Sequence, residues 1–196
     1  MRQQKRKETR ARISKAALGL FIAKGFEATT LDELAVAAGI SRRTFFHYFK
    51  SKEEVLVGCA TTDFKDEILQ GVVELGQSCA PLGAIEQVMT RLAVKYESPK
   101  LLHVDRLLGA TDGLRERQDA GYVDLELALA QTFKQVWGKR LPDDEARLIA
   151  LIAVGNLRIA KERWRLPENT SSLERCMRVT FALTREKAPA LAKTPG

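Results

Sequence analysis

Apolar residues recur every three or four positions along most of the chain, which is the spacing of one buried face on an α-helix. The clearest example is an unbroken stripe near the N-terminus, formed by Ile13, Ala16, Ala17, Leu20 and Phe21. Together with the Gly, Pro and Ser residues at its breaks, this pattern predicts long helices over residues 9–24, 51–75, 82–96, 100–109, 114–137, 142–164 and 171–187. No segment shows the sustained alternation of a β-strand. The sequence therefore predicts an all-α protein.

Capping residues predict two shorter helices between residues 30 and 50. Thr30, Ser41 and Ser51 each precede an apolar run, and a hydroxyl at such a position accepts a hydrogen bond from the first helical turn. Glu33 and Glu54 follow Thr30 and Ser51 by three residues, which is the spacing of a capping box. These signals mark the starts of three successive helices.

A tight turn joins the first two of these helices. Gly39 interrupts the apolar pattern, and Ile40 supplies one apolar side chain to the turn. Arg42 and Arg43 then occupy the first turn of the second helix. Two short helices in this arrangement are typical of a helix-turn-helix, in which the second helix enters the major groove of DNA.

The distribution of charge also favours a nucleic-acid partner. The chain has 32 Lys and Arg residues against 25 Asp and Glu, and residues 1–50 contain 11 of the basic and 4 of the acidic ones. The net charge of +7 therefore lies in the segment with the helix-turn-helix, while the remainder is neutral. A solvated N-terminal tail is the simpler alternative, but it does not account for Arg42, Arg43, Lys50 and Lys52.

The segment from about residue 9 to residue 56 resembles the DNA-binding domain of the TetR (tetracycline-repressor) family of bacterial transcription regulators. The matching residues read GF-x-x-TT from Gly25 and A-x-x-AGIS-x-x-T-x-F-x-YF-x-SKE from Ala35. The resemblance implies a DNA-binding domain over residues 1–55 and an effector-binding and dimerisation domain over residues 56–188. Residues 189–196 show no packing signal and are expected to form a disordered tail. The resemblance further implies a homodimeric, ligand-responsive repressor that binds a palindromic operator in double-stranded DNA.

The candidates for DNA contact are polar residues of the helix-turn-helix and its flanks: Thr29, Thr30, Ser41, Arg42, Arg43, Thr44, His47, Tyr48 and Lys52. An arginine can bind guanine O6 and N7 with two hydrogen bonds, and a phosphate contact is the alternative for both arginines. The family resemblance places the other side chains against phosphates or bases, with capping or packing as the alternative for the threonines. Phe46 departs from the family pattern, which often has Tyr, and Phe cannot donate a hydrogen bond to a phosphate.

The C-terminal segment is expected to bind a small hydrophobic or amphipathic effector. Ten residues could line its pocket: Phe64, Met89, Leu92, His103, Leu107, Tyr122, Leu125, Phe133, Asn156 and Arg158. An ordinary core is the alternative for the apolar members. The polar members are more informative because buried polar groups need partners. Arg158 could pair with a carboxylate of the effector or with a Glu of the chain.

The last two predicted helices are the candidates for a dimer interface, because a two-fold dimer needs the same patch on both subunits. Eight residues form the expected patch: Ala153, Leu157, Ala160, Leu173, Met177, Thr180, Phe181 and Thr184. Ser171 and Glu174 have the spacing of a further capping box at the start of the last helix. The alternative is that these stripes face the core of their own chain.

Several classes of protein are not expected. The sequence shows no Ser/His/Asp arrangement, metal-ligand spacing or glycine-rich phosphate loop, which argues against an enzyme and against a metal or cofactor. No apolar stretch reaches the roughly 18 residues of a membrane span, and the N-terminus lacks the apolar core of a signal peptide. We therefore expect a cytoplasmic protein with no membrane partner, in which Cys59, Cys79 and Cys176 are small core residues. The alternative function is a DNA-binding regulator without a small-molecule effector, controlled by a protein partner or acting as an activator.

Overall fold

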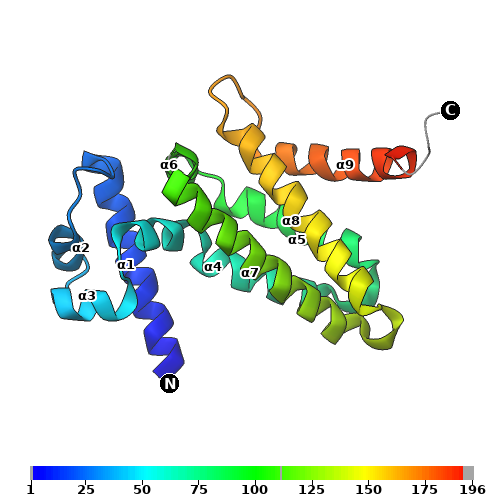
Figure 1. Ribbon diagram of the computed structural model, residues 1–196, viewed down its shortest axis with the longest axis horizontal. Coiled ribbons are helices and arrows are strands. Elements are labelled where there is room, and N and C mark those ends of the chain that lie inside the picture. Colours follow the sequence, from blue (N-terminus) through cyan, green and yellow to red (C-terminus); the bar gives the residue numbers. More distant parts are fainter. Residues whose placement is uncertain (1, 111, 192–196) are drawn as a thin grey trace. The chain divides into compact units, whose positions relative to one another are not determined.

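The computed structural model describes residues 2–110 and 112–191, and these contain nine α-helices, two short 3₁₀ turns and no strand. The all-α prediction is confirmed. The α-helices are α1 (Arg2–Lys24), α2 (Leu31–Ala37), α3 (Arg42–Tyr48), α4 (Lys52–Leu75), α5 (Pro81–Tyr96), α6 (Pro99–Ala110), α7 (Asp112–Trp137), α8 (Asp143–Arg165) and α9 (Leu173–Leu191) (Figure 1). The 3₁₀ turns η1 (Gly76–Ser78) and η2 (Gly138–Arg140) follow α4 and α7.

The chain divides into two compact units. Residues 1–62 and 98–120 form the first unit, and residues 63–97 and 121–196 form the second unit. The predicted domain boundary after residue 55 lies within α4, and the first unit also includes α6 and the start of α7. The reason is packing, because Val104, Leu108 and Leu114 belong to the same buried core as Ile13 and Phe45. Apolar spacing alone does not show which core a helix joins.

Aromatic side chains build the centre of the first unit. Phe21, Phe45 and Phe49 are fully buried, and Phe26 lies beside them. The ring centroids are 5.2 Å apart for Phe21 and Phe26 and 6.1 Å apart for Phe45 and Phe49. Burying one such side chain stabilises a fold by about 1.5–3 kcal/mol. These rings come from α1, α3 and the segments that follow them, and Leu34 and Ala35 of α2 belong to the same core.

Helices α5, α8 and α9 pack against one another in the second unit. The inward face of α8 consists largely of fully buried small residues, namely Ala146, Ala150, Ala153 and Ala160. Small side chains let helices approach closely. Helix α9 places Met177 and Phe181, both fully buried, in this core.

Three ends differ from the prediction. Helix α1 begins at Arg2 rather than near residue 9, because its first turns carry polar helix-forming residues that apolar spacing does not detect. Ser172, not Ser171, caps α9 and accepts a hydrogen bond from the Arg175 N–H at 3.0 Å. Helix α9 extends to Leu191, so the predicted tail begins inside it, and residues 192–196 lie outside the described residues.

All three cysteines are free thiols, with Cys176 buried and Cys59 and Cys79 half-buried. The Cys59 Sγ donates to the Ser14 carbonyl oxygen at 3.1 Å, and burial raises the pKa of the Cys59 thiol to about 12. Burial also raises the pKa of Cys176. Both thiols therefore stay protonated near neutral pH. Within the part of the chain that the structure describes, no helix is long and apolar enough to cross a bilayer.

Candidate nucleic-acid interface

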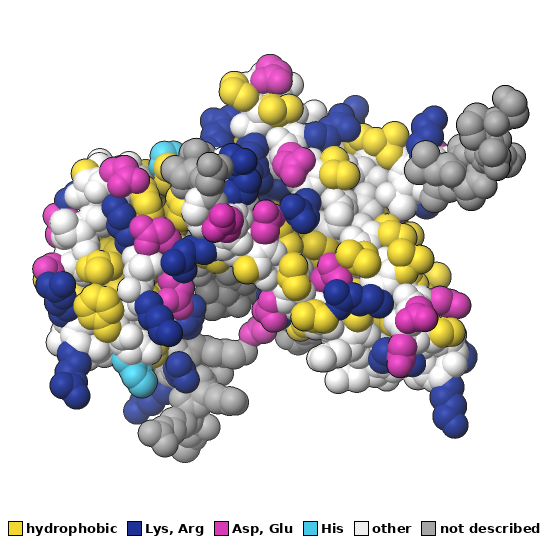
Figure 2. Space-filling model, viewed as in Figure 1, with side chains coloured by type: hydrophobic (Ala, Val, Ile, Leu, Met, Phe, Trp, Pro, Cys, Tyr) yellow, Lys and Arg dark blue, Asp and Glu magenta, His cyan; other side chains and the backbone are white. Residues whose placement is uncertain are grey.

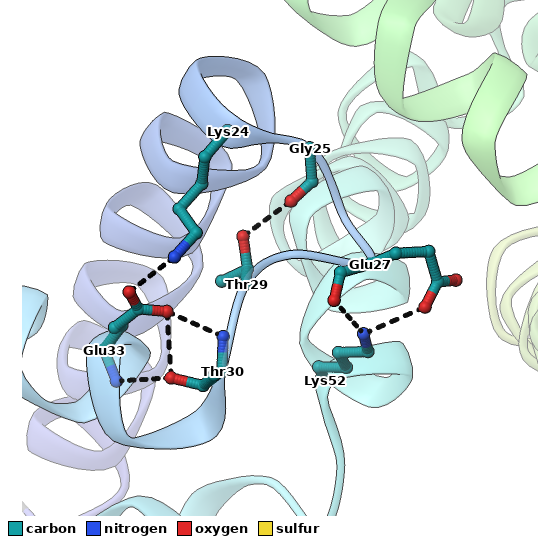
Figure 3. Close-up of polar contacts among 7 residues, drawn as sticks. All are labelled: Lys24, Gly25, Glu27, Thr29, Thr30, Glu33 and Lys52. Atoms are coloured by element: carbon teal, nitrogen blue, oxygen red, sulfur yellow. Dashed lines mark hydrogen bonds and ion pairs between the residues drawn. The ribbon is translucent and has the colours of Figure 1, made fainter.

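Helix α2 begins at the predicted capping box. The Thr30 Oγ1 accepts from the Glu33 N–H at 3.3 Å, and the Glu33 Oε2 accepts from the Thr30 N–H at 2.8 Å (Figure 3). The Lys24 ammonium forms an ion pair with the same carboxylate. The hydrogen bond from Lys24, with those from Thr30, lowers the pKa of Glu33 to about 2. The cap therefore stays charged at any ordinary pH and ties α2 to the end of α1.

The turn after α2 and the cap at Ser41 set the direction of helix α3. Gly39 has a φ of +64°, in the left-handed region that favours glycine, and the Ile40 N–H donates to the Ala35 carbonyl at 3.0 Å. The Ser41 Oγ then accepts from the Thr44 N–H at 3.1 Å. Helix α3 is only seven residues long. Its direction depends on these bonds and on the fully buried ring of Phe45.

Arg10 of α1 fixes the other end of α3. Its Nη1 donates to the Tyr48 carbonyl at 2.9 Å, and its guanidinium carbon lies 4.2 Å from the Phe49 ring centroid. Its Nη2 lies 3.5 Å from the Glu54 Oε1. Sequence reasoning missed Arg10. The available signal was its place three residues before Ile13, the first member of the apolar stripe, on the same face of α1.

The outward face of α3 presents the predicted recognition residues Arg42, Arg43 and His47, together with Phe46. The Arg42 Nη1 lies 3.1 Å from the Asp32 Oδ2, and the Arg42 guanidinium carbon lies 5.8 Å from the Phe46 ring centroid. Among the described residues, the Arg43 side chain has no hydrogen bond or ion pair. The face therefore offers one restrained and one unrestrained guanidinium to a ligand rich in oxygen and nitrogen acceptors.

His47 and Tyr48 lie side by side at the end of α3. Their ring centroids are 5.4 Å apart with the planes nearly perpendicular, and His47 is exposed while Tyr48 is half-buried. Ser41 and Thr44, two further DNA candidates, share a 2.8 Å hydrogen bond between their hydroxyls. These groups are near enough to the outward face to meet a ligand, but capping already occupies Ser41.

Two predicted phosphate contacts have partners inside the unit (Figure 3). Thr29 is buried, and its hydroxyl donates to the Gly25 carbonyl at 2.7 Å, so it stabilises the loop between α1 and α2 and does not face outward. The Lys52 Nζ lies 3.1 Å from the Phe26 carbonyl oxygen and 3.3 Å from both a carbonyl and a carboxylate oxygen of Glu27. A phosphate would have to compete with these three acceptors for Lys52.

The surface of the first unit mixes charges of both signs. Over the region where Figure 1 places α2 and α3, Figure 2 shows Lys and Arg side chains interspersed with Asp and Glu. Lys50 is exposed, and among the described residues its ammonium has no partner, although its N–H donates to the Glu54 Oε2 at 2.8 Å. Free cations such as Arg43 and Lys50 are the groups available to a polyanion.

The predicted effector residues fall into both units. Eight lie in the second unit, where Met89, Leu92, Tyr122, Leu125, Phe133 and Asn156 are buried, Phe64 is half-buried and Arg158 is exposed. His103 and Leu107 belong to α6 in the first unit, and His103 is exposed. The spacing places all ten on helices, but it does not show which of them would line one cavity.

The polar effector candidates differ in how well they are satisfied. The Asn156 Nδ2 donates to the Ile152 carbonyl at 2.9 Å, and its Oδ1 accepts from Thr184 at 3.0 Å, so this amide has partners within the chain. The Tyr122 hydroxyl is buried and has no hydrogen-bond partner in the described part of the chain. The Arg158 guanidinium carbon lies 5.3 Å from the Tyr122 ring centroid.

The predicted dimer residues pack within their own chain. Seven of the eight are buried, namely Ala153, Leu157, Ala160, Leu173, Met177, Thr180 and Phe181, and Thr184 is half-buried. A face that is already covered inside one chain is not available to a second copy, so the alternative that the sequence left open applies to this set. The opposite face of α8 instead exposes Leu148, Leu151 and Ile159, with relative exposures of 56%, 48% and 50%.

The chain is similar to known bacterial regulators. A family profile described as bacterial regulatory proteins, tetR family, matches residues 13–59. The HTH-type transcriptional regulator TcmR of Streptomyces glaucescens is 30% identical over 182 residues, which cover 87% of this chain and 79% of TcmR. RutR of Escherichia coli K12, also an HTH-type transcriptional regulator, is 32% identical over 102 residues, covering 50% of this chain and 48% of RutR.

Solved structures agree on the fold. The structure of FadR from Thermus thermophilus, a TetR family transcriptional repressor in complex with lauroyl-CoA, has a TM-score of 0.62 and 25% identity, covering 95% of this chain and 99% of FadR. A TetR-family regulator structure from Mesorhizobium loti has a TM-score of 0.63 and 22% identity, covering 94% of this chain and 97% of the regulator. Both likenesses extend beyond the helix-turn-helix to nearly the whole chain.

Proposed function

Because the chain belongs to the TetR family of bacterial transcription regulators, which are not enzymes, we propose that it is a homodimeric repressor controlled by a small effector. It binds a palindromic DNA operator and releases it when the effector binds. The observation that carries the proposal is the outward face of α3, where Arg42, Arg43 and His47 project from a helix anchored by Phe45. A short capped helix with long polar side chains at its start fits the major groove of B-DNA.

The side chains on and near this face are proposed to bind different parts of the DNA. Arg42 and Arg43, in the first turn of α3, read base edges, because an arginine fork matches guanine O6 and N7. Lys50 meets a phosphate, because its ammonium is exposed and has no partner among the described residues. Phosphate contacts set position and affinity, whereas base contacts set sequence.

The exposed apolar stripe of α8 supports a homodimer. Leu148, Leu151 and Ile159 share one face of the helix, and Leu183 of α9 is 41% exposed. Exposed apolar patches of this kind favour association, and a two-fold axis would let each copy cover the other. Two recognition helices about 34–36 Å apart would then meet successive major grooves on one side of the duplex.

The effector is proposed to be hydrophobic or amphipathic and to bind in the second unit. FadR, which resembles this chain over nearly its full length, binds lauroyl-CoA, an amphipathic ligand. The second unit also contains buried hydroxyls of Thr90 and Tyr122 that have no hydrogen-bond partner among the described residues. A buried polar group without a partner is costly, and a ligand polar atom would satisfy it.

Selection of binding sites from random duplex DNA tests the proposal. We expect an enriched sequence with two inverted half-sites, and a complex of two chains by light scattering. Addition of acyl-CoA thioesters, with free coenzyme A as the control, should release the operator. Enrichment of no sequence would refute the regulator, a single half-site would refute the palindrome, and failure of every amphipathic probe would favour control by a protein partner.

A further inference from the structure

Asp32 is an acidic residue on the surface that is proposed to meet DNA. It lies in the first turn of α2, and the Asp32 and Arg42 side chains are 63% and 62% exposed. A carboxylate at such a place repels phosphates, so its presence works against affinity. The neighbouring Glu33 serves the capping box and Lys24, whereas Asp32 has its 3.1 Å contact with Arg42. The two acids of this turn therefore have different roles.

The contribution of the Asp32–Arg42 ion pair to folding stability is too small to explain why the contact is present. An exposed ion pair contributes about 0–1 kcal/mol, because solvent screens it and two side chains lose freedom. The contact nevertheless restrains the guanidinium from one side, and the Phe46 ring lies 5.8 Å away. Arg43, one residue on in the same helical turn, has no such partner in the described part of the chain.

We propose that Asp32 is a specificity-determining positioning residue that holds Arg42 for a base edge and keeps it from binding phosphates indiscriminately. The inference rests on the proposed operator binding. An arginine fork has five N–H donors, so one nitrogen on Asp32 leaves donors for guanine O6 and N7. Restraint before binding reduces the ordering cost at the correct site, and the carboxylate penalises contact with DNA that offers no matching base.

The test compares Asp32→Asn with the unchanged protein on three duplexes: the selected operator, operators with single base-pair changes, and a scrambled duplex. Loss of one positioned base contact should lower the preference for operator over scrambled DNA by about tenfold. The affinity for the operator should fall, because Arg42 loses its restraint. The affinity for the scrambled duplex should rise, because the variant removes a negative charge that repels the phosphates. A purely structural role would not produce this opposite change.

The matched variants locate the effect. Asp32→Asn should relax preference at the same base pair in each half-site as Arg42→Ala, whereas Arg43→Ala should relax a different one. In the Arg42→Ala background, Asp32→Asn should relax nothing further. Asp32→Glu keeps the charge and should restore part of the discrimination. Thermal melting should be the same for all of these variants.

Three outcomes would overturn the inference. Equal gains on all duplexes would make Asp32 a repulsive charge only. Unchanged discrimination would leave it without a role in recognition, and relaxation that persists without Arg42 would show that it acts through another residue. If the unchanged protein selects no sequence at all, the proposed function fails as well, so failure of the two ideas is distinguishable.

Discussion

The first unit keeps most of its predicted functional side chains on the surface, whereas the second unit buries most of its own. Arg42, Arg43 and His47 are exposed on α3, while Met89 and Phe133 lie in a closed core. DNA is a surface ligand that meets side chains around a capped motif, so a short stretch of sequence can specify the site. An effector or a second subunit competes with the core for the same apolar side chains.

Helix α8 illustrates this competition. It is apolar on two faces, with small buried residues such as Ala150 and Ala153 on one and the exposed Leu148 and Leu151 on the other. Sequence reasoning offered the small residues as part of a dimer patch, with the core of their own chain as the alternative. The structure places them against the chain's own helices, because small side chains serve close packing of any two helices.

The largest effect is expected from a substitution in the core of the second unit, which is compared with a substitution on its exposed apolar stripe. Phe181→Glu buries a charge in the core and removes a fully buried ring, so it should destabilise the protein by more than about 4 kcal/mol. Leu151→Glu changes a residue that is 48% exposed and should leave the fold intact while it weakens the proposed dimer. Thermal unfolding by circular dichroism and light scattering measure the two effects. A folded, monomeric Phe181→Glu variant would restore α9 as the dimer interface.

Sequence reasoning succeeded where the determinants were local. The caps at Thr30 and Ser41, the turn at Gly39 and the order of the helices follow from residues within a few positions of one another. It failed where the determinants were distant. The place of α6 in the first unit depends on residues far along the chain, and so does the contact of Arg10 with the end of α3. The site residues it missed, Arg10 and Asp32, act through contacts between helices.

A smaller effect is expected from Arg43→Ala in the first unit. Because Arg43 is exposed and lacks a partner among the described residues, its loss should leave the melting temperature unchanged. Operator affinity should fall by about 10- to 100-fold, with little change on scrambled DNA. Binding titrations on both duplexes measure this, with Arg140→Ala, an exposed residue of the second unit, as the control. Equal losses on both duplexes would make Arg43 a phosphate contact.

Lys50 and Lys52 of the first unit are expected to have different roles, one in DNA binding and the other in stability. Lys50→Ala should lower the slope of log affinity against log salt by about 0.9, because one phosphate contact is lost. Lys52→Ala should leave that slope unchanged and lower stability by about 1 kcal/mol, because the ammonium serves the carbonyls of Phe26 and Glu27. A changed slope for Lys52→Ala without a change in melting would instead support the phosphate contact that the family resemblance implies.

The smallest effect concerns the pH dependence of the Glu33 cap. The pKa of Glu33 is lowered to about 2, so its contribution to stability is complete above the ordinary glutamate value of 4.5 and is lost as the pH falls through the lowered value. The difference in melting temperature between the unchanged protein and Glu33→Gln should therefore shrink as the pH is lowered below about 4.5. Glu168→Gln, an exposed residue of the second unit, should show no such trend. A carboxyl NMR titration of Glu33 near 4.5 would contradict the prediction.

The reactivity of the Cys59 thiol can report how often the first unit opens. Cys59 lies on α4 and donates to the Ser14 carbonyl on α1, with its pKa raised to about 12. An alkylating reagent needs an accessible thiolate, and Cys59 is half-buried with a raised pKa, so its modification should be slow and should become faster when these two helices part. The rate of modification thus measures how often the helix-turn-helix loses its support. Operator DNA is proposed to bind at the outward face of α3, and it should slow the reaction by the factor with which it favours the closed unit.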